Sequence, residues 1–150
     1  MLNYISKRRR LILEGLGDET VTNGEFTSDL SGWAVVGASP TWVWTSSNGQ
    51  GVAFIFGTPT GVKELNQTIT VEDGERYYVE VDMVKGTTSE LQVNVDASTI
   101  ISIASVEGKI KMSGEFVASG TTADLQIATV TDTSYVENIN RISVKKINWK

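Results

Sequence analysis

The sequence contains neither cysteine nor histidine. Without cysteine the chain forms no disulfide and offers no thiolate to a metal or a substrate. Without histidine it lacks the side chain that most often serves as general base near neutral pH. These absences exclude most nucleophile–base pairs and most transition-metal sites. Carboxylates, lysine, tyrosine and hydroxyl side chains remain, so a carboxylate-pair hydrolase or a calcium site stays open.

Long apolar runs are also absent. The apolar stretches are strand-sized and fall well short of the ~18 residues that a membrane helix needs, so we expect no membrane partner. Residues 11–17 carry Glu14 and make a poor signal-peptide core. We therefore expect a protein that is made in the cytoplasm of the cell that produces it, without a signal peptide.

Positive charge is scarce outside the first ten residues. The chain has a net charge of −5, and Lys7, Arg8, Arg9 and Arg10 give residues 1–10 a charge of +4, which leaves −9 for the rest. An acidic body repels phosphate, so nucleic acid is disfavoured as a partner.

From Val21 onward the sequence is rich in short segments in which apolar and polar residues alternate, as in residues 77–83 and 91–95. This period is typical of antiparallel strands with one buried and one solvated face. Asn48-Gly49 and Asp73-Gly74 predict hairpin turns. We predict an all-β antiparallel sandwich over residues 21–150, preceded by an arm of residues 1–20. The expected core includes Trp33, Val79, Val81, Val93, Phe116 and Leu125.

The segment NGEFTSDLSGW, residues 23–33, resembles the opening of carbohydrate-binding modules with a galactose-binding-like jelly-roll fold. The matching residues are Asn23, Gly24, Phe26, Leu30, Gly32 and Trp33. Residues 65–86, 114–128 and 136–147 are similar to later strands of that family, in the same order. The resemblance covers about residues 21–147 and implies a jelly-roll sandwich with a sugar ligand.

The same resemblance implies a structural calcium between the opening loop and the last strand, held by carboxylates and backbone carbonyls. Thr27 stands where the family usually has an acid, and Asn140 and Arg141 stand in place of its two terminal aspartates. Glu25 and Asn140 remain as weak candidate ligands. We therefore expect no calcium and no other cofactor.

Two groups of residues are candidates for a ligand face. Trp42 and Trp44 are two positions apart in an expected strand, so their rings would face the same way. They would stack on sugars, anchor an interface or fill the core, and we favour the core. If their strands are neighbours, a second face comprises Tyr78, Glu80, Asp82, Gln92, Asn94 and Asp96. Acids on alternate residues are most simply a solvated face, so we expect no enzymatic activity.

The arm is expected to dock on another protein. Its candidate contact residues are Leu2, Tyr4, Ile5, Lys7, Arg8, Arg9, Arg10, Leu11 and Leu13. Ordering such a segment costs about 1–2 kcal/mol per residue, which a partner surface or an acidic neighbouring copy would offset.

Jelly-roll domains headed by such an arm are similar to accessory proteins of bacteriophage particles, such as capsid decorations, head fibres and tail adhesins. This predicts a non-catalytic structural protein of the virion whose partners are phage capsid or tail subunits. Self-association and a surface glycan are further expectations. The alternative is a free carbohydrate-binding module.

Overall fold

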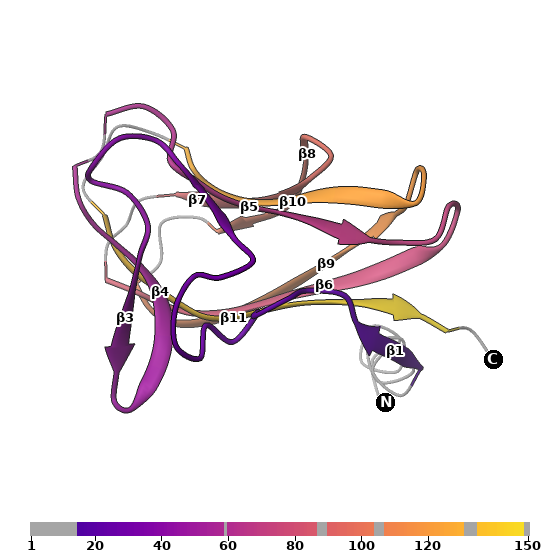
Figure 1. Ribbon diagram of the computed structural model, residues 1–150, viewed down its shortest axis with the longest axis horizontal. Coiled ribbons are helices and arrows are strands. Elements are labelled where there is room, and N and C mark those ends of the chain that lie inside the picture. The colour runs from indigo at the N-terminus through magenta and orange to yellow at the C-terminus, as the bar shows by residue number, and fades with distance from the viewer. Residues whose placement is uncertain (1–14, 59, 87–89, 104–106, 131–134, 149–150) are drawn as a thin grey trace, which may run out of the picture.

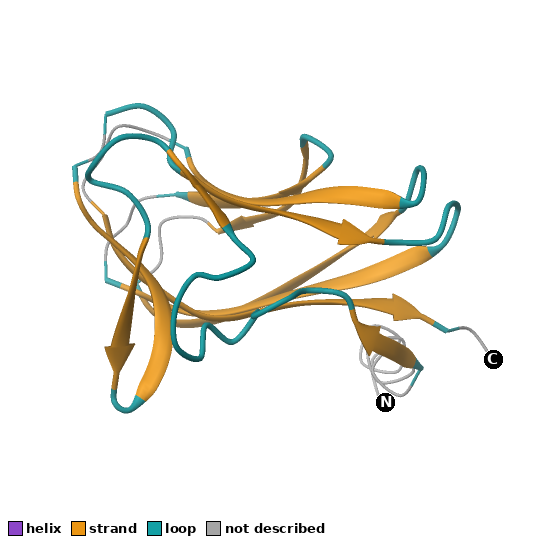
Figure 2. Ribbon diagram, viewed as in Figure 1, coloured by secondary structure: helices purple, strands orange, loops and turns teal. Residues whose placement is uncertain are grey.

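The chain folds into two antiparallel sheets packed face to face, and Figure 2 shows no helix in the part of the chain that is described. No helix there could cross a membrane. The computed structural model describes residues 15–58, 60–86, 90–103, 107–130 and 135–148. The predicted all-β sandwich is confirmed.

One layer, called sheet A, has the strand order β3–β4–β11–β6–β9, with β1 also paired to β11 (Figure 1). The other layer, called sheet B, has the order β2–β5–β10–β7–β8. The strands of sheet A are β1 (Leu16–Glu19), β3 (Val43–Ser47), β4 (Gln50–Gly57), β6 (Arg76–Lys85), β9 (Gly108–Val117) and β11 (Tyr135–Ile147). Those of sheet B are β2 (Ala34–Val36), β5 (Glu64–Thr70), β7 (Leu91–Val95), β8 (Ser98–Ile103) and β10 (Thr122–Thr129).

The core lies between the sheets and is formed by every second residue of the central strands. All six residues predicted to be buried are buried. Because side chains alternate across a strand, the residues between them project from the outer faces. Those outer faces are therefore where a ligand would meet the sandwich.

The opening motif forms a loop that is organised by Asn23, whose φ is 50°. Its Oδ1 accepts a hydrogen bond from the backbone of Thr27 at 3.2 Å, and its Nδ2 donates to the carbonyls of Asp29 and Ser31 at 3.0 and 3.1 Å. The indole of Trp33 donates to the carbonyl of Asn23 at 3.2 Å. Asparagine tolerates this backbone conformation and supplies both hydrogen-bonding groups, which explains its place in the motif.

The two predicted hairpin turns have different outcomes. Asn48-Gly49 joins β3 to its partner β4, and both residues have positive φ, as the hairpin prediction requires. Asp73-Gly74 instead joins β5 of sheet B to β6 of sheet A, so the hairpin prediction is wrong there. The turn carries the chain from one layer to the other.

The boundary of the arm also needs correction. Leu16–Glu19, assigned to the arm from the sequence, forms β1 and pairs with β11, with Leu16 opposite Ile147. The Glu19 carboxylate accepts a hydrogen bond from the backbone of Val144 at 2.8 Å. The sandwich therefore includes Leu16–Glu19. The predicted docking residues, from Leu2 to Leu13, lie outside the described residues.

Each sheet also turns polar side chains inward. In sheet A, Lys85 and Glu137 are paired in register on β6 and β11, and their charged groups lie 3.1 Å apart with both side chains fully buried. In sheet B, Gln67 accepts a hydrogen bond from the backbone of Thr22 and donates to the carbonyls of Thr22 and Gly32. The ion pair joins two strands, whereas the amide holds the opening loop against the sheet.

Candidate functional site

The two tryptophans do not form a shared ligand face. Trp42 precedes β3, is only 1 % exposed, and donates its indole hydrogen to the carbonyl of Lys63 at 3.4 Å. Trp44 lies within β3 and is 38 % exposed, and its indole donates to the carbonyl of Phe26 at 2.7 Å. The prediction that the rings fill the core therefore holds for Trp42. The hydrogen bond of Trp44 instead holds the opening loop against the edge of sheet A.

The second predicted face is also not a single surface, because β6 belongs to sheet A and β7 to sheet B. Tyr78, Glu80 and Asp82 project from one side of the molecule, whereas Gln92 and Asn94 project from the other. Tyr78 is buried against Ile147. Glu80 forms an ion pair with Lys111 at 3.1 Å. Asp82 alone of these β6 residues lines a hollow on the outer face of sheet A.

The outer face of sheet A carries an aromatic pair that the sequence analysis did not single out. Phe54 and Phe56 of β4 stack with ring centroids 6.2 Å apart and planes at 20°, and Phe56 is 63 % exposed. Val43 of β3 is opposite Phe54 and is also exposed. Exposed aromatic rings of this kind provide flat apolar contact area. We call these three residues the phenylalanine platform.

A polar hollow of about 280 Å³ continues the same face across the sheet. A row of residues that are opposite one another on neighbouring strands, called a register row, links it to the platform. In this row Phe54 is opposite Asn138, Asn138 is opposite Val84, and Val84 is opposite Lys109. Val84 and Lys109 belong to both the row and the hollow. The hollow is lined by Glu25, Gln50, Asp82, Val84, Lys109, Asn140 and Arg141. The face therefore places an apolar platform beside amide, carboxylate and cationic groups.

The residues at the family's calcium position do not fit that ion. Glu25 lies 3.9 Å from the guanidinium of Arg141, so a cationic side chain already stands beside the only carboxylate of the predicted pair. The Oδ1 atom of Asn140 is buried and has no hydrogen-bond partner among the described residues. A hard divalent cation needs six to eight oxygen ligands. Within the described ranges no cluster of three or more acidic residues could hold a metal.

A larger hollow, of about 800 Å³, lies on the outer face of sheet B. Its floor comes from β5 and β10, and its sides come from the segment at Gly32–Ala34 and the turn at Asp96-Ala97. We call it the amide groove. Its lining residues are Gly32, Trp33, Ala34, Asn66, Gln67, Thr68, Asp96, Ala97, Asp124, Leu125 and Gln126.

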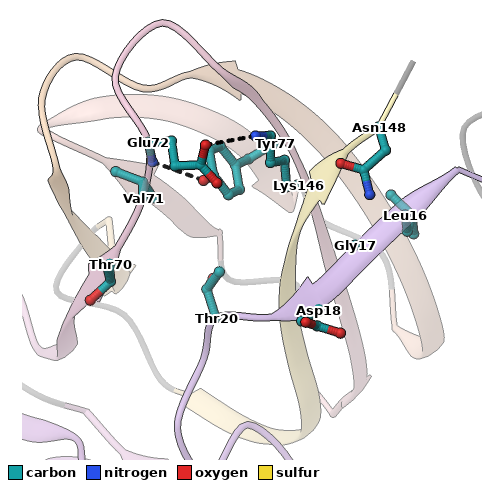
Figure 3. Close-up of a pocket in the computed structure, with 10 residues that line it drawn as sticks. All are labelled: Leu16, Gly17, Asp18, Thr20, Thr70, Val71, Glu72, Tyr77, Lys146 and Asn148. Atoms are coloured by element: carbon teal, nitrogen blue, oxygen red, sulfur yellow. Dashed lines mark hydrogen bonds and ion pairs between the residues drawn. The ribbon is translucent and has the colours of Figure 1, made fainter. Parts of the chain in front are cut away.

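A third hollow, of about 610 Å³, lies beside β1 at one end of the sandwich (Figure 3). Lys146 forms ion pairs there with Glu72 at 2.8 Å and Glu75 at 3.6 Å, and the hydrogen bond to Glu72 is the main reason that the pKa of Lys146 is raised above its usual value. The backbone of Glu72 donates to the hydroxyl of Tyr77 at 2.9 Å. The charged groups of Lys146, Glu72 and Glu75 are therefore paired with one another.

Comparison with known proteins identifies the fold. No protein-family model matches the chain, and no curated protein matches it in sequence. Solved structures do match. The carbohydrate-binding module TmCBM61, solved with β-1,4-galactotriose, superposes with a TM-score of 0.73 at 12% identity, covering 87% of this chain and 99% of its own.

Two further structures show the range of the similarity. The CBM22-1 xylan-binding domain of Xyn10C from Paenibacillus barcinonensis has a TM-score of 0.61 at 15% identity, covering 89% of this chain and 97% of its own. The enzymatically active domain of bacteriophage CBA120 tailspike protein 4 has a TM-score of 0.63 at 14% identity, covering 86% of this chain and 21% of its own. The fold is the jelly-roll β-sandwich of carbohydrate-binding modules, as the opening motif implied.

Proposed function

We propose that this chain is a non-catalytic carbohydrate-binding module that binds a polysaccharide across the outer face of sheet A. The observation that carries the proposal is the stacked pair Phe54 and Phe56, of which Phe56 is 63 % exposed and Phe54 lies in the register row that leads to a polar hollow. Aromatic rings pack against the apolar face of a pyranose ring, and nearby polar groups hydrogen-bond its hydroxyls. Similarity to modules that bind galactotriose and xylan supports this chemistry.

The length of the face suits an oligosaccharide. The row from Val43 to Lys109 crosses five strands. Since strands lie about 4.8 Å apart, the row extends roughly 19 Å, enough for several sugar units. One sugar would stack on Phe56, and its neighbours would lie over Asn138 and then over the hollow, where Gln50 and Asp82 can accept hydrogen bonds from hydroxyls.

The carboxylates of this face favour binding over hydrolysis. A retaining or inverting glycosidase needs a protonated acid and a second carboxylate on either side of the scissile bond. Here Glu25 stands beside Arg141, and Glu80 is paired with Lys111. Both carboxylates are therefore engaged by cationic side chains, which supports binding rather than hydrolysis as the proposed role.

The test is affinity electrophoresis in gels that contain soluble β-1,4-galactan or xylan. We expect retardation of the wild-type chain in at least one of them, loss of retardation in Phe56→Ala, and retention in Phe56→Trp. Val117→Ala is the matched control, because Val117 is also an exposed apolar residue and lies at the far end of β9. Unchanged migration of the wild-type chain in both gels, or normal retardation of Phe56→Ala, would refute the proposal.

We further infer that the module acts within a larger assembly, with the bacteriophage particle as the proposed location. The similarity to a tailspike domain and the cationic cluster from Lys7 to Arg10 support this role. The test removes residues 1–14 only, because Leu16–Glu19 belongs to sheet A. The truncated chain should stay folded and keep its polysaccharide binding, but should no longer co-sediment with particles. Normal co-sedimentation would contradict the docking role and leave the glycan proposal intact.

A further inference from the structure

We propose that the amide groove on sheet B is a second saccharide site, independent of the phenylalanine platform and specific for uncharged sugars. The groove and the platform lie on the outer faces of opposite sheets. A chain with two such sites would bridge two polysaccharide strands. This goes beyond the proposed function, which needs only the outer face of sheet A.

The floor of the groove carries the amides of Asn66 and Gln126, and Asn94 of β7 continues this ladder of amides beside it. Asn66 of β5 is opposite Gln126 of β10, and Gln126 is opposite Asn94 of β7. Asn94 donates its Nδ2 hydrogen to Oε1 of Gln126 at 2.8 Å. Since that bond occupies the carbonyl end of the Gln126 amide, its Nε2 end is the donor that Gln126 offers to a ligand.

Asn66 supplies the complementary group. Its Nδ2 donates to Oε2 of Glu64 at 3.0 Å, which leaves its Oδ1 as an acceptor. That oxygen is buried and has no partner in the part of the chain that the structure describes. Buried acceptors without partners are rare and costly. A sugar hydroxyl between Asn66 and Gln126 would donate to one amide and accept from the other.

Two carboxylates line the groove. Oδ1 of Asp124 accepts from the hydroxyl of Thr68 at 2.8 Å, and Oδ1 of Asp96 accepts from the backbone of Asp124 at 2.8 Å. These bonds hold both side chains in place and use one oxygen of each. The other oxygens can accept from sugar hydroxyls. The same charges repel uronates, sulfated sugars and phosphate, which is why the site is assigned to neutral sugars.

The recognition differs in kind from that of sheet A. Among the described residues that line the groove, Trp33 is the only aromatic one, and it is 7 % exposed, so little ring surface is available for stacking. Binding would rest on hydrogen bonds to hydroxyls in a fixed arrangement. Such contacts discriminate between sugars that differ in the orientation of a single hydroxyl.

The experiment is an NMR titration of the ¹⁵N-labelled Phe56→Ala variant, which removes the platform and so separates the two proposals. The probes are the trisaccharides of β-1,4-linked galactose, xylose and glucose, with trigalacturonate and inorganic phosphate as anionic controls. We expect at least one neutral trisaccharide to shift the side-chain NH₂ signals of Asn66, Asn94 and Gln126 in a saturable way. Neither anion should do so.

Two matched variants then localise the site. Gln126→Ala should weaken the interaction about tenfold, as expected for a lost hydrogen bond together with an unpaired partner. Gln92→Ala should change it less than about twofold, because Gln92 lies on the same face of neighbouring β7 but outside the groove. The proposal is overturned if no neutral probe shifts the ladder signals, if the anions shift the same set, or if both glutamine variants weaken binding equally.

Discussion

The outer faces of the two sheets arise from the same alternation of residues, yet they differ in chemistry. Sheet A presents the rings of Phe54 and Phe56 on β4 and the ion pair of Glu80 and Lys111 on β6 and β9. Sheet B presents the amides of Asn66, Gln126 and Asn94 in a register row. The strand geometry sets where a side chain stands, and the residue type at each outward position sets what that face can bind. One fold can therefore carry two surfaces with separate specificities.

The polar groups that face inward also differ between the two sheets, with charged groups in sheet A and an amide in sheet B. Sheet A holds a charged pair between two of its strands, whereas sheet B holds an amide that binds the opening loop. Removing each group in turn would show whether the two sheets depend on their interior polar contacts to the same degree.

The largest effect is expected from Glu137→Ala in sheet A. Removing one member of a buried ion pair leaves the other charge without compensation, which typically costs about 3–5 kcal/mol of unfolding free energy. Urea denaturation measures this change. The double variant Lys85→Met/Glu137→Met should recover much of the loss, because no charge is then left buried. A single variant as stable as the wild-type chain would mean that the pair is not buried as described.

A smaller effect is expected from Gln67→Leu in sheet B. Three hydrogen bonds to Thr22 and Gly32 are lost, and we expect a cost of about 1–3 kcal/mol. Because Gly32 forms one side of the amide groove, binding there should also weaken, while binding at the phenylalanine platform should not. Denaturation together with the electrophoresis and NMR assays above checks both parts. Equal loss of binding on both faces would count against their independence.

A still smaller effect concerns Asp29 in the loop that reaches the amide groove. Hydrogen bonds from the side chain and backbone of Ser31 hold the pKa of Asp29 below its ordinary value of 3.8. Because the folded pKa is depressed, the stabilisation is present above pH 3.8 and is lost as the pH falls through the folded value. An NMR titration should find the lowered pKa, and Ser31→Ala should raise it towards 3.8. Identical titrations in both proteins would refute this assignment.

The smallest expected effect is that of a chelator. Because Arg141 stands beside Glu25, we expect thermal unfolding curves with and without EDTA to coincide. A melting temperature that falls by many degrees on chelation would show that the outer face of sheet A holds a cation after all.

Much of the fold could be predicted because alternation identifies strands and the opening motif identifies the loop. The neighbours of each strand could not be predicted as readily. Consecutive strands β6 and β7 lie in different sheets, so Asp82 and Asn94 project from opposite sides. That arrangement depends on long-range pairing, which no local pattern specifies. The turn that leads into β8, Asp96-Ala97, is also hard to recognise from the sequence, because it contains no glycine although both residues have positive φ.

The candidate site was harder to predict than the core. In β4 both sets of alternating residues are apolar, so the period does not reveal whether Ala53 and Ile55 or Phe54 and Phe56 face the solvent. The structure places Ala53 and Ile55 in the core. The amides of β5 and β10 were overlooked because their significance depends on register, which brings Asn66 next to Gln126 only after the sheet has formed.

The pairing of β1 with the end of β11 has a practical consequence for attaching the protein to a support. Asn148 donates its backbone hydrogen to the carbonyl of Gly15 at 2.7 Å, so the chain enters and leaves the sandwich at neighbouring points (Figure 1). A linker joined before Gly15 or after Asn148 would start from the same corner. An immobilised module should therefore be held at the same corner whichever end is tethered, which suits it to affinity surfaces and fusion proteins.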